Sequence, residues 1–196
     1  MVDVRKADRG ERVGIAATLA NAFANDPVCC WMSGLDDCEA RMVPFWRSLV
    51  KTNLAKSDEV YVADDLSGVA MWRGVDDWKL PPLDVARAVP ALMRSLRLRL
   101  PLALQLLGKM EKAHPTAPHY YLEFLGTRRD RQSKGIGTAV LAPILARCDA
   151  EGVPAYLESS NPRNIAFYAR QGFVESGVVS APKDGPKMTT MWREPR

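Results

Sequence analysis

A glycine-rich segment in the second half of the chain has the residue types and spacing to bind a phosphate group. Residues 132–138 read Gln-Ser-Lys-Gly-Ile-Gly-Thr and lie between an apolar run at 120–125 and an apolar stretch at 139–148. This order predicts a strand, a tight turn and the start of a helix. The first N–H groups of a helix have no partner inside the helix, and the helix dipole leaves partial positive charge there. We therefore predict that this turn binds a phosphate or pyrophosphate.

Two common phosphate-binding fingerprints do not fit this turn. A P-loop requires Gly-Lys followed by Ser or Thr at a fixed distance after a first glycine, and the chain has no such segment. The dinucleotide fingerprint requires a third small residue where this chain has Val140, and no parallel-sheet alternation opens the chain. The remaining pattern is Gln-x-x-Gly-x-Gly after a strand.

Glu123 is a candidate base because it is a carboxylate in an otherwise apolar strand. Strand alternation predicts two faces, with Tyr120, Leu122 and Phe124 on one and Tyr121, Glu123 and Leu125 on the other. Burial would raise the pKa of the Glu123 carboxyl and suit it to abstract a proton, directly or through water.

Glu158, at the end of the neighbouring predicted strand, is the rival candidate. It can serve as the base or as an anchor for the acceptor, and it can equally be a partner of Arg163 or of backbone amides. The two histidines, His114 and His119, lie beside a turn, and we expect both to be solvated rather than catalytic.

Bulk composition predicts one globular domain over residues 1–196, as a monomer or homodimer without a bound metal. The chain is too short for two ordinary domains. Its net charge of +4 is mild and dispersed, so we expect no nucleic-acid partner. It has no apolar run of about eighteen residues and no secretory layout at its start, so we expect no membrane partner and a cytoplasmic location. The four cysteines show no metal or redox spacing.

Hydrophobic periodicity predicts an α/β fold in which strands and helices alternate. Helices are expected over 8–25, ended by Asp26-Pro27, then over 39–55, from the turn to 150, and over a short stretch between Asn161 and Gly172. Residues 83–112 are expected to form a helical insert interrupted by Pro90 and Pro101. Strands are expected over 3–7, 60–63, 69–73, 120–125, 154–158, 173–179 and 187–192.

The turn and a second motif resemble the GCN5-related N-acetyltransferase (GNAT) family. Gln-x-x-Gly-x-Gly after a strand is similar to the family's loop for the pyrophosphate of acyl-coenzyme A, and residues 156–173 resemble its strand, short helix and Tyr…Gly-Phe signature. The resemblance implies a twisted, mainly antiparallel mixed sheet flanked by helices, with the helical insert before the central strand. Several stretches are similar to puromycin N-acetyltransferase and its bacterial relatives, namely 21–27, 60–65, 68–72 and 152–158, whereas the insert resembles them least.

The resemblance implies acetyl-CoA as the cofactor. In this family the strand before the turn splays from the next strand, and its free backbone groups hold the pantetheine arm; the matching positions are Leu125, Gly126 and Thr127. Asn161 and Asn164 are expected to add contacts, although Asn161 is equally explained as a helix cap. The turn residues assigned to the cofactor are Gln132, Ser133, Lys134, Gly135, Ile136, Gly137 and Thr138. Arg128, Arg129 and Arg131 either meet phosphates by charge or form a solvated basic loop.

Tyr168 stands where family members place the tyrosine that protonates the coenzyme A thiolate. A phenol with a pKa of ~10 is protonated at neutral pH and can give its proton to a thiolate whose pKa is ~8.5. The alternative is a tyrosine that only packs its ring. Many family members have a glutamate two residues before Glu123, where this chain has Tyr121, so Glu123 and Glu158 both stay open as the base.

The first two helices and the insert are expected to build the acceptor pocket, from Asn21, Phe23, Asp26, Trp31, Phe45, Trp46, Trp72 and Trp78. We predict an acetyl-CoA-dependent N-acetyltransferase acting on a primary amine of a small molecule, such as an aminonucleoside-like or antibiotic amine. Direct attack in a ternary complex is expected because no cysteine falls near either motif. The alternatives are a non-catalytic acyl-CoA-binding module and a protein or peptide N-acetyltransferase.

Overall fold

A seven-stranded mixed sheet organises the molecule, for which a computed structural model describes residues 2–34, 37–56, 59–75, 77–79 and 81–196. The strand order is β1-β2-β3-β4-β5-β7-β6, and every neighbouring pair is antiparallel except β4 with β5. The predicted mainly antiparallel mixed sheet is therefore confirmed. The strands are β1 (Val4–Lys6), β2 (Val60–Ala63), β3 (Gly68–Arg73), β4 (Tyr120–Thr127), β5 (Ala155–Ser159), β6 (Val174–Ser180) and β7 (Lys187–Arg193).

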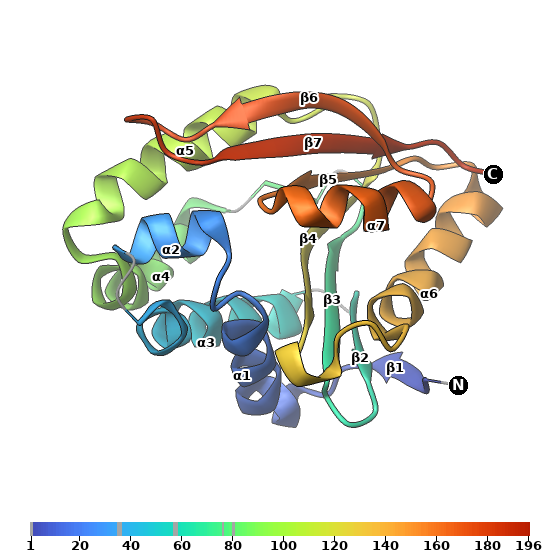
Figure 1. Ribbon diagram of the computed structural model, residues 1–196, viewed down its shortest axis with the longest axis horizontal. Helices are drawn as coiled ribbons and strands as arrows, with labels where there is room; N and C mark the ends of the chain where they lie inside the picture. The colour runs from blue at the N-terminus through green and yellow to red at the C-terminus, as the bar shows by residue number, and fades with distance from the viewer. Residues whose placement is uncertain (1, 35–36, 57–58, 76, 80) are drawn as a thin grey trace.

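Helices cover both faces of the sheet (Figure 1). One apolar core forms where α6 and α7 pack on the sheet, and a second forms on the opposite face under α1 and α3. A third cluster joins α2 and α5 to β6 and β7. The helices are α1 (Arg12–Ala22), α2 (Pro27–Ser33), α3 (Cys38–Lys56), α4 (Pro82–Leu96), α5 (Leu100–Ala113), α6 (Ile136–Glu151) and α7 (Ile165–Arg170). Among the described residues, no helix combines the length and the apolar character needed to cross a bilayer.

The predicted insert is present as the helix pair α4 and α5, but it is interrupted at a different residue. Pro90 lies inside α4, so the prediction that it interrupts the insert is wrong. The chain turns instead at the short segment Arg97–Arg99, where Arg97 has a left-handed φ of 50°. Pro101 stands in the first turn of α5, where a missing N–H costs no helical hydrogen bond.

Helix α2 was not expected, because Asp26-Pro27 was interpreted only as the end of the first helix. The same two residues also begin α2. The Asp26 carboxylate accepts hydrogen bonds from the amides of Val28 and Cys29, and Pro27 occupies the first helical position. This is the usual start of a helix, so the signal was present in the sequence.

The parallel strands β4 and β5 separate after a short contact. Three residue pairs join them, and the last is Leu122 with Leu157. Beyond it, β4 stays with β3 as far as Thr127, whereas β5 stays with β7 as far as Ser159. We call this opening between the two strands the fork. Its β4 edge, which includes Leu125, Gly126 and Thr127, carries backbone groups that are not used by β5 in the described structure.

A β-bulge in β4 redirects the side chains beside the fork. Met71 pairs with Phe124 and Trp72 pairs with Leu122, so Glu123 is the extra residue. Leu122 packs in the core under α6, whereas Phe124 packs in the core under α1 and α3. The predicted alternation, which placed Leu122 and Phe124 on one face, is therefore wrong, because the bulge shifts it by one residue.

Gly68 leaves room for the residue that begins α6, and we expect the variant Gly68→Ala to be destabilised. A Cβ at Gly68 would lie 2.2 Å from Cγ2 of Ile136, a β-branched side chain with little freedom to move. The free energy of unfolding should fall by about 1–3 kcal/mol in urea titrations. Gly108→Ala in α5 is the control. A Cβ there meets no described atom within 4 Å, and alanine should stabilise the helix by about 0.5–1 kcal/mol. Equal stability of the two variants would contradict this account.

Candidate active site

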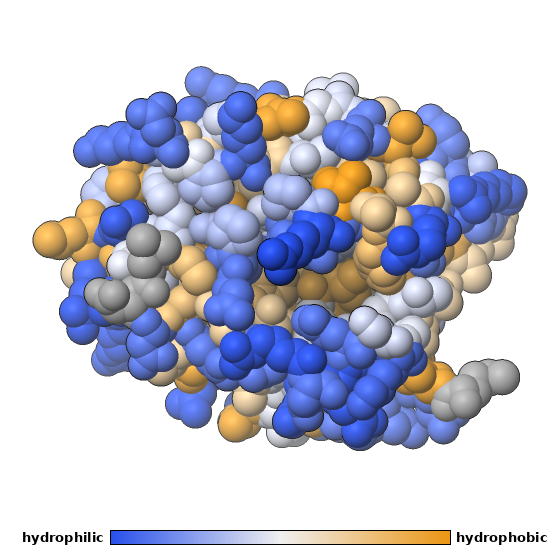
Figure 2. Space-filling model, viewed as in Figure 1, coloured by the Kyte–Doolittle hydropathy of each residue, from blue (hydrophilic) through white to orange (hydrophobic). Residues whose placement is uncertain are grey.

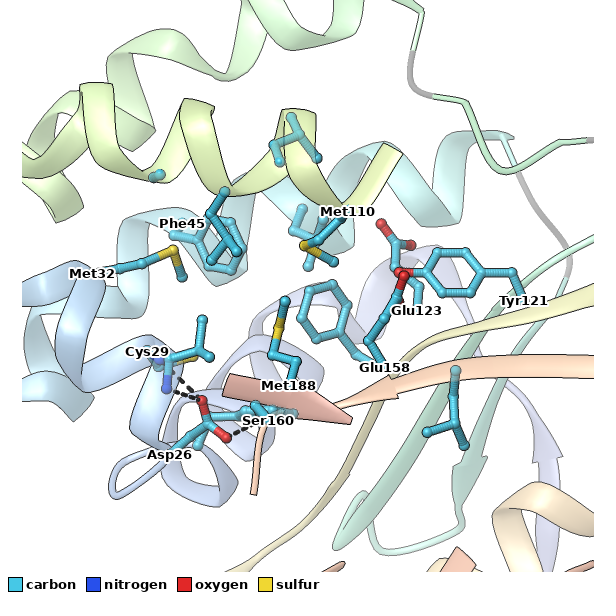
Figure 3. Close-up of a pocket in the computed structure, with 18 of the residues that line it drawn as sticks. Asp26, Cys29, Met32, Phe45, Met110, Tyr121, Glu123, Glu158, Ser160 and Met188 are labelled. Atoms are coloured by element: carbon cyan, nitrogen blue, oxygen red, sulfur yellow. Dashed lines mark hydrogen bonds between the residues drawn. The ribbon is translucent and has the colours of Figure 1, made fainter. Parts of the chain in front are cut away.

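A cavity of about 300 Å³ opens beside the fork and brings predicted site residues together (Figure 3). Tyr168, Glu123, Glu158, Leu125 and Asn164 all line it. They come from α7, from the two arms of the fork, and from the short 3-10 segment Pro162–Asn164 before α7. Tyr121 and Glu123 both line the cavity.

Glu123 is held by a buried arginine that the sequence analysis did not foresee. Nε of Arg73 lies 3.0 Å from Oε2 of Glu123, and the two side chains are 4% and 10% exposed. Arg73 comes from β3, the antiparallel neighbour of β4. The guanidinium thus provides a buried opposite charge at ion-pair distance from this carboxyl group. Glu123 therefore belongs to an ion pair, not to the apolar setting that the sequence predicts.

Glu158 is a cavity-lining carboxylate that has no arginine or lysine at ion-pair distance in the described structure. Its side chain is 3% exposed. Oε1 is buried without a well-formed hydrogen bond to any described group, and its nearest basic atom is Nδ1 of His114, at 3.8 Å. Arg163, the predicted alternative partner, is exposed on the segment before α7. An unsatisfied buried carboxylate oxygen is costly, so this position is suited to a proton or a cationic group.

The two histidines are buried beside Glu158, so the prediction that they are solvated is wrong. His114 is 8% exposed and His119 is 3% exposed. The His114 ring stacks on Trp78, with 3.8 Å between centroids, and the edges of the Tyr121 and Tyr156 rings approach it. Sequence position alone gave no sign of this, because the enclosing rings come from three distant segments.

The hydrogen bonds of the histidines leave a place for one proton next to Glu158. Nδ1 of His119 lies 2.7 Å from the carbonyl oxygen of Ala117, which only accepts, so this nitrogen carries hydrogen. Nε2 of neutral His119 then accepts from Nε2 of His114, 3.0 Å away. Nδ1 of neutral His114 consequently carries a lone pair and faces Oε1 of Glu158. A proton added to this pair can be bound by either group.

Tyrosines complete the surroundings of Glu158. Burial, followed by the charge of Glu158, raises the pKa of Tyr121 well above its ordinary value. The same two causes raise the pKa of Tyr156. Both phenols therefore stay protonated at neutral pH. Figure 3 shows the Tyr121 hydroxyl together with the carboxylates of Glu123 and Glu158 at one end of the cavity.

Tyr168 approaches the cavity from the opposite side of the fork. It is 7% exposed, and its ring packs near Phe167 and Phe173 in the core under α6 and α7. Burial, followed by the charge of Asp26, raises the pKa of Tyr168. The phenol thus packs its ring and also lines the cavity as a protonated group.

Asp26 ties the β5 arm of the fork to α2. One carboxylate oxygen caps α2 through the amides of Val28 and Cys29, and the other accepts a hydrogen bond from the hydroxyl of Ser160, just past β5. Cys29 also lines the cavity. Cys29 is far from both motifs in the sequence, so its place at the cavity was not foreseen. Burial raises the pKa of the Cys29 thiol well above its ordinary value.

The turn before α6 presents backbone amides to solvent at the far end of β4. Ser133 and Gly135 have left-handed φ values of 62° and 77°, and Gly135 directly precedes the helix. The side-chain amide of Gln132 donates from Nε2 to the carbonyl of Thr127 at 3.3 Å and holds the turn to the end of β4. Figure 2 shows a hollow with an apolar floor and a mostly hydrophilic rim between α7 and this turn.

The two glycines of the turn have different roles. A Cβ on Gly135 would meet no described atom within 4 Å, so open space lies in front of this backbone. A Cβ on Gly137 would lie 3.3 Å from the Phe167 ring, so this glycine allows α6 to pack closely on α7. The expected close approach to an anion therefore fits Gly135, and Gly137 is explained by packing.

Charged side chains around the turn already have partners. Arg129 pairs with Glu39 at 2.6 Å and Arg131 pairs with Asp65 at 2.7 Å. The ammonium of Lys134 donates to the carbonyl of Asp130 at 3.3 Å. Exposed ion pairs of this kind contribute little and exchange readily. The backbone amides, including those of Ile136, Gly137 and Thr138 in the first helical turn, are the permanent donors.

The remaining predicted positions divide between the cavity and the core. Phe23, Asp26, Phe45 and Trp78 line the cavity, whereas Trp46 and Trp72 are fully buried in the two cores. The Asn21 side chain forms hydrogen bonds with Glu39 and with the backbone amide of Arg129. Trp31 packs in the third cluster. Asn161 caps the segment before α7 by accepting a hydrogen bond from the backbone amide of Arg163.

A family model and a curated relative both indicate an acetyltransferase. The model of the acetyltransferase (GNAT) family matches residues 103–173, which include β4, the turn, α6, β5 and α7. The chain is 28% identical to an uncharacterized N-acetyltransferase of Schizosaccharomyces pombe, over 92% of this chain and 78% of that protein.

Solved structures share the whole fold. The structure of histone acetyltransferase HPA2 and related acetyltransferase from Corynebacterium glutamicum has a TM-score of 0.72 and 25% identity, and covers 100% of this chain and 98% of that one. An agmatine N-acetyltransferase has a TM-score of 0.66 and 13% identity, and covers 98% of this chain and 99% of that one. The chain is thus similar to the acetyltransferase (GNAT) family, and the protein is an acetyltransferase enzyme.

Proposed function

We propose that the protein transfers the acetyl group of acetyl-CoA to a primary amine of a small molecule. The observation that carries this proposal is the fork, because Tyr168 and Glu158 line one cavity beside it. An acid and a base are thereby available at the place where a thioester and an amine would meet. The cavity of about 300 Å³ is at the small end for ligand pockets, which favours a small acceptor over a protein segment.

The residues at hand fit acetyl-CoA, whose thioester supplies the acetyl group when it is bound. The amides from Ser133 to Thr138 would hold the pyrophosphate, with open space in front of Gly135. Gln132 positions the turn, and Lys134 adds charge. The backbone groups of Leu125, Gly126 and Thr127 that do not pair with β5 would hold the pantetheine arm and the thioester carbonyl, while the Thr127 carbonyl also accepts from the Gln132 side chain. Asn164 lines the cavity and would add a contact there, whereas Asn161 acts through its cap.

Glu158 serves as the base in this proposal. The acceptor enters as an ammonium, gives one proton to the Glu158–His114 pair and becomes a neutral nucleophile. With acetyl-CoA bound, this nitrogen would attack the thioester carbonyl carbon as the carbon–sulfur bond breaks. The Tyr168 phenol would give its proton to the leaving thiolate and regain a proton from the acylated nitrogen, which becomes a neutral amide. Glu123 orders the site through its ion pair with Arg73.

Direct transfer to the amine is favoured over an acyl-enzyme. Cys29 is the cysteine that lines the cavity, and its raised pKa keeps it as a thiol. The thiolate is the nucleophilic form, so a protonated and buried cysteine is a poor acyl carrier. Transfer through a ternary complex follows.

The proposal is tested by mixing the purified protein with acetyl-CoA and a panel of amines and following the release of thiol. Puromycin, other aminonucleosides, polyamines, aminoglycosides and peptides belong in the panel, since the puromycin-type subgroup stays a prediction. Turnover with a small amine supports the proposal. Turnover with peptides alone contradicts the small-molecule acceptor, and failure to bind acetyl-CoA contradicts the proposed cofactor.

A glycine pair at the two ends of α6 tests the pyrophosphate site. Gly135 and Gly152 both have left-handed φ values, 77° and 66°, and in both a Cβ meets no described atom within 4 Å. Alanine at either position costs about 1–2 kcal/mol of strain. We expect Gly135→Ala to weaken acetyl-CoA binding about tenfold by calorimetry, because relief of the strain moves the amides. Gly152→Ala should bind as the wild type does, and equal losses in both variants would overturn the assignment.

A further inference from the structure

The cavity wall away from the fork is apolar and comes from the insert and its neighbours. Leu92 of α4, Leu107 and Met110 of α5, Phe45 and Leu49 of α3, and Met32 of α2 line it. Each of these side chains is only partly buried, so apolar surface remains uncovered inside the cavity. Figure 3 shows Met32, Phe45, Met110 and Met188 turned toward this common space. Methionines adapt their shape, so such a wall fits apolar groups of varied outline.

Glu158 is the buried carboxylate at this cavity without a strong counter-charge, whereas Glu111 also lines the cavity but is exposed to solvent. Asp26 accepts from two amides and from Ser160, Asp84 pairs with Lys56, and Glu123 pairs with Arg73. Glu158 has only His114 at ion-pair distance, and its Oε1 stays buried without a well-formed bond in the described structure. A cationic group that enters the cavity is therefore attracted to Glu158 beside the fork. The rest of the same molecule then lies against the apolar wall.

We propose that the acceptor is a primary amine carried on an apolar body, an alkyl or arylalkyl amine. The inference rests on the proposed function and names the substrate class of the same site. The ammonium binds at Glu158 and the body lies along Leu92, Leu107 and Met110. A second charge or a polar chain on the acceptor would lose its hydration against this wall without finding partners, so polyamines and aminoglycosides are disfavoured.

A homologous series of primary n-alkylamines measures the contact with the wall. We expect kcat/KM to rise about fourfold for each added methylene until the cavity is filled, because each buried methylene transfers favourably out of water. α,ω-Diamines of equal length should show no such rise. Acetyl-CoA affinity, measured separately by calorimetry, should be the same throughout.

Two leucines of the insert provide a matched pair of variants. Leu107 lines the cavity, whereas Leu98 is 95% exposed on the connection between α4 and α5 and does not line it. Leu107→Asn should lower kcat/KM for the longest amine about tenfold and flatten the dependence on chain length. Leu98→Asn should leave both unchanged.

The outcomes separate this inference from the proposed function. A flat series, faster turnover of diamines or peptides, or equal effects of the two leucine variants would overturn the apolar acceptor while acetyl transfer stands. Binding of acetyl-CoA without turnover of any alkylamine would also overturn it. Absence of acetyl-CoA binding would instead remove the proposed function. A rising series that Leu107→Asn flattens and Leu98→Asn does not supports the inference.

Discussion

The variant Tyr168→Phe should turn over about 10²–10⁴ times more slowly than the wild type, the range that one positioned acid contributes. The substitution removes only the hydroxyl, and the ring keeps its packing beside Phe167 and Phe173. Because the lost interaction belongs to the departure of the thiolate, kcat should fall while the affinity for acetyl-CoA stays the same. Stopped-flow thiol release and calorimetry measure the two quantities.

The pH dependence gives a second check on Tyr168. Its pKa is raised above the ordinary value of ~10, so the phenol keeps its proton as the pH rises to about 10. The acid is thus not lost in that range, and kcat of the wild type should show no alkaline decline below about pH 10 that the phenylalanine variant lacks. Tyr168→Phe with unaltered kcat would leave Tyr168 as a packing residue only.

Glu158→Gln should lower kcat/KM for the amine about 10²-fold or more, because glutamine cannot take the proton that the ammonium must lose. The side chain is isosteric, and Oε1 of Glu158 makes no well-formed hydrogen bond in the described structure that the amide would break. The free energy of unfolding should therefore change little. Steady-state thiol release at several pH values and urea unfolding measure both effects.

Glu123→Gln is the matched comparison and should behave in the opposite way. It leaves the guanidinium of Arg73 buried without a counter-charge, so we expect a loss of about 1–3 kcal/mol in stability. Its kcat/KM should stay within about tenfold of the wild type. If Glu123→Gln abolishes turnover and Glu158→Gln does not, the roles that we assign to the two carboxylates are exchanged.

The sequence predicted the elements of this fold well because most of their signals are local. The apolar periodicity of the helices, the turn before α6 and the helical character of the insert each depend on neighbours a few positions apart. The bulge at Glu123 was missed because it arises from the pairing of β4 with β3, where Met71 and Trp72 face three residues of β4. Pairing between distant segments leaves no local trace. Helix α2 was missed for a different reason. Asp26-Pro27 was interpreted only as the end of one helix, although the same two residues also begin the next.

The candidate site was predicted only in part, because local motifs reveal some of its residues and long-range packing determines the others. Tyr168 and the turn were predicted from motifs, and Glu158 from its place at the end of a predicted strand. The structure brings Tyr168 and Glu158 to one cavity. Arg73 and the pair His114 and His119 were not, because their importance depends on burial beside carboxylates from other strands. A lone histidine in a sequence carries no sign of the rings that enclose it. The cofactor contacts of the turn stay predictions.

The fork also marks a seam in the sheet, which we define as the short contact between β4 and β5 that joins strands β1–β4 to strands β5–β7. Three residue pairs join β4 to β5, and just past β5 the Ser160 hydroxyl donates to Asp26 at the start of α2. Neither the part of the sheet before this seam nor the part after it holds a complete site. A ligand that fills the fork touches both parts and binds only when they are docked, so its binding energy adds to the stability of the folded chain. Acetyl-CoA bound at the proposed site would therefore link the two parts of the sheet. The free energy of unfolding should be largest when acetyl-CoA is in excess.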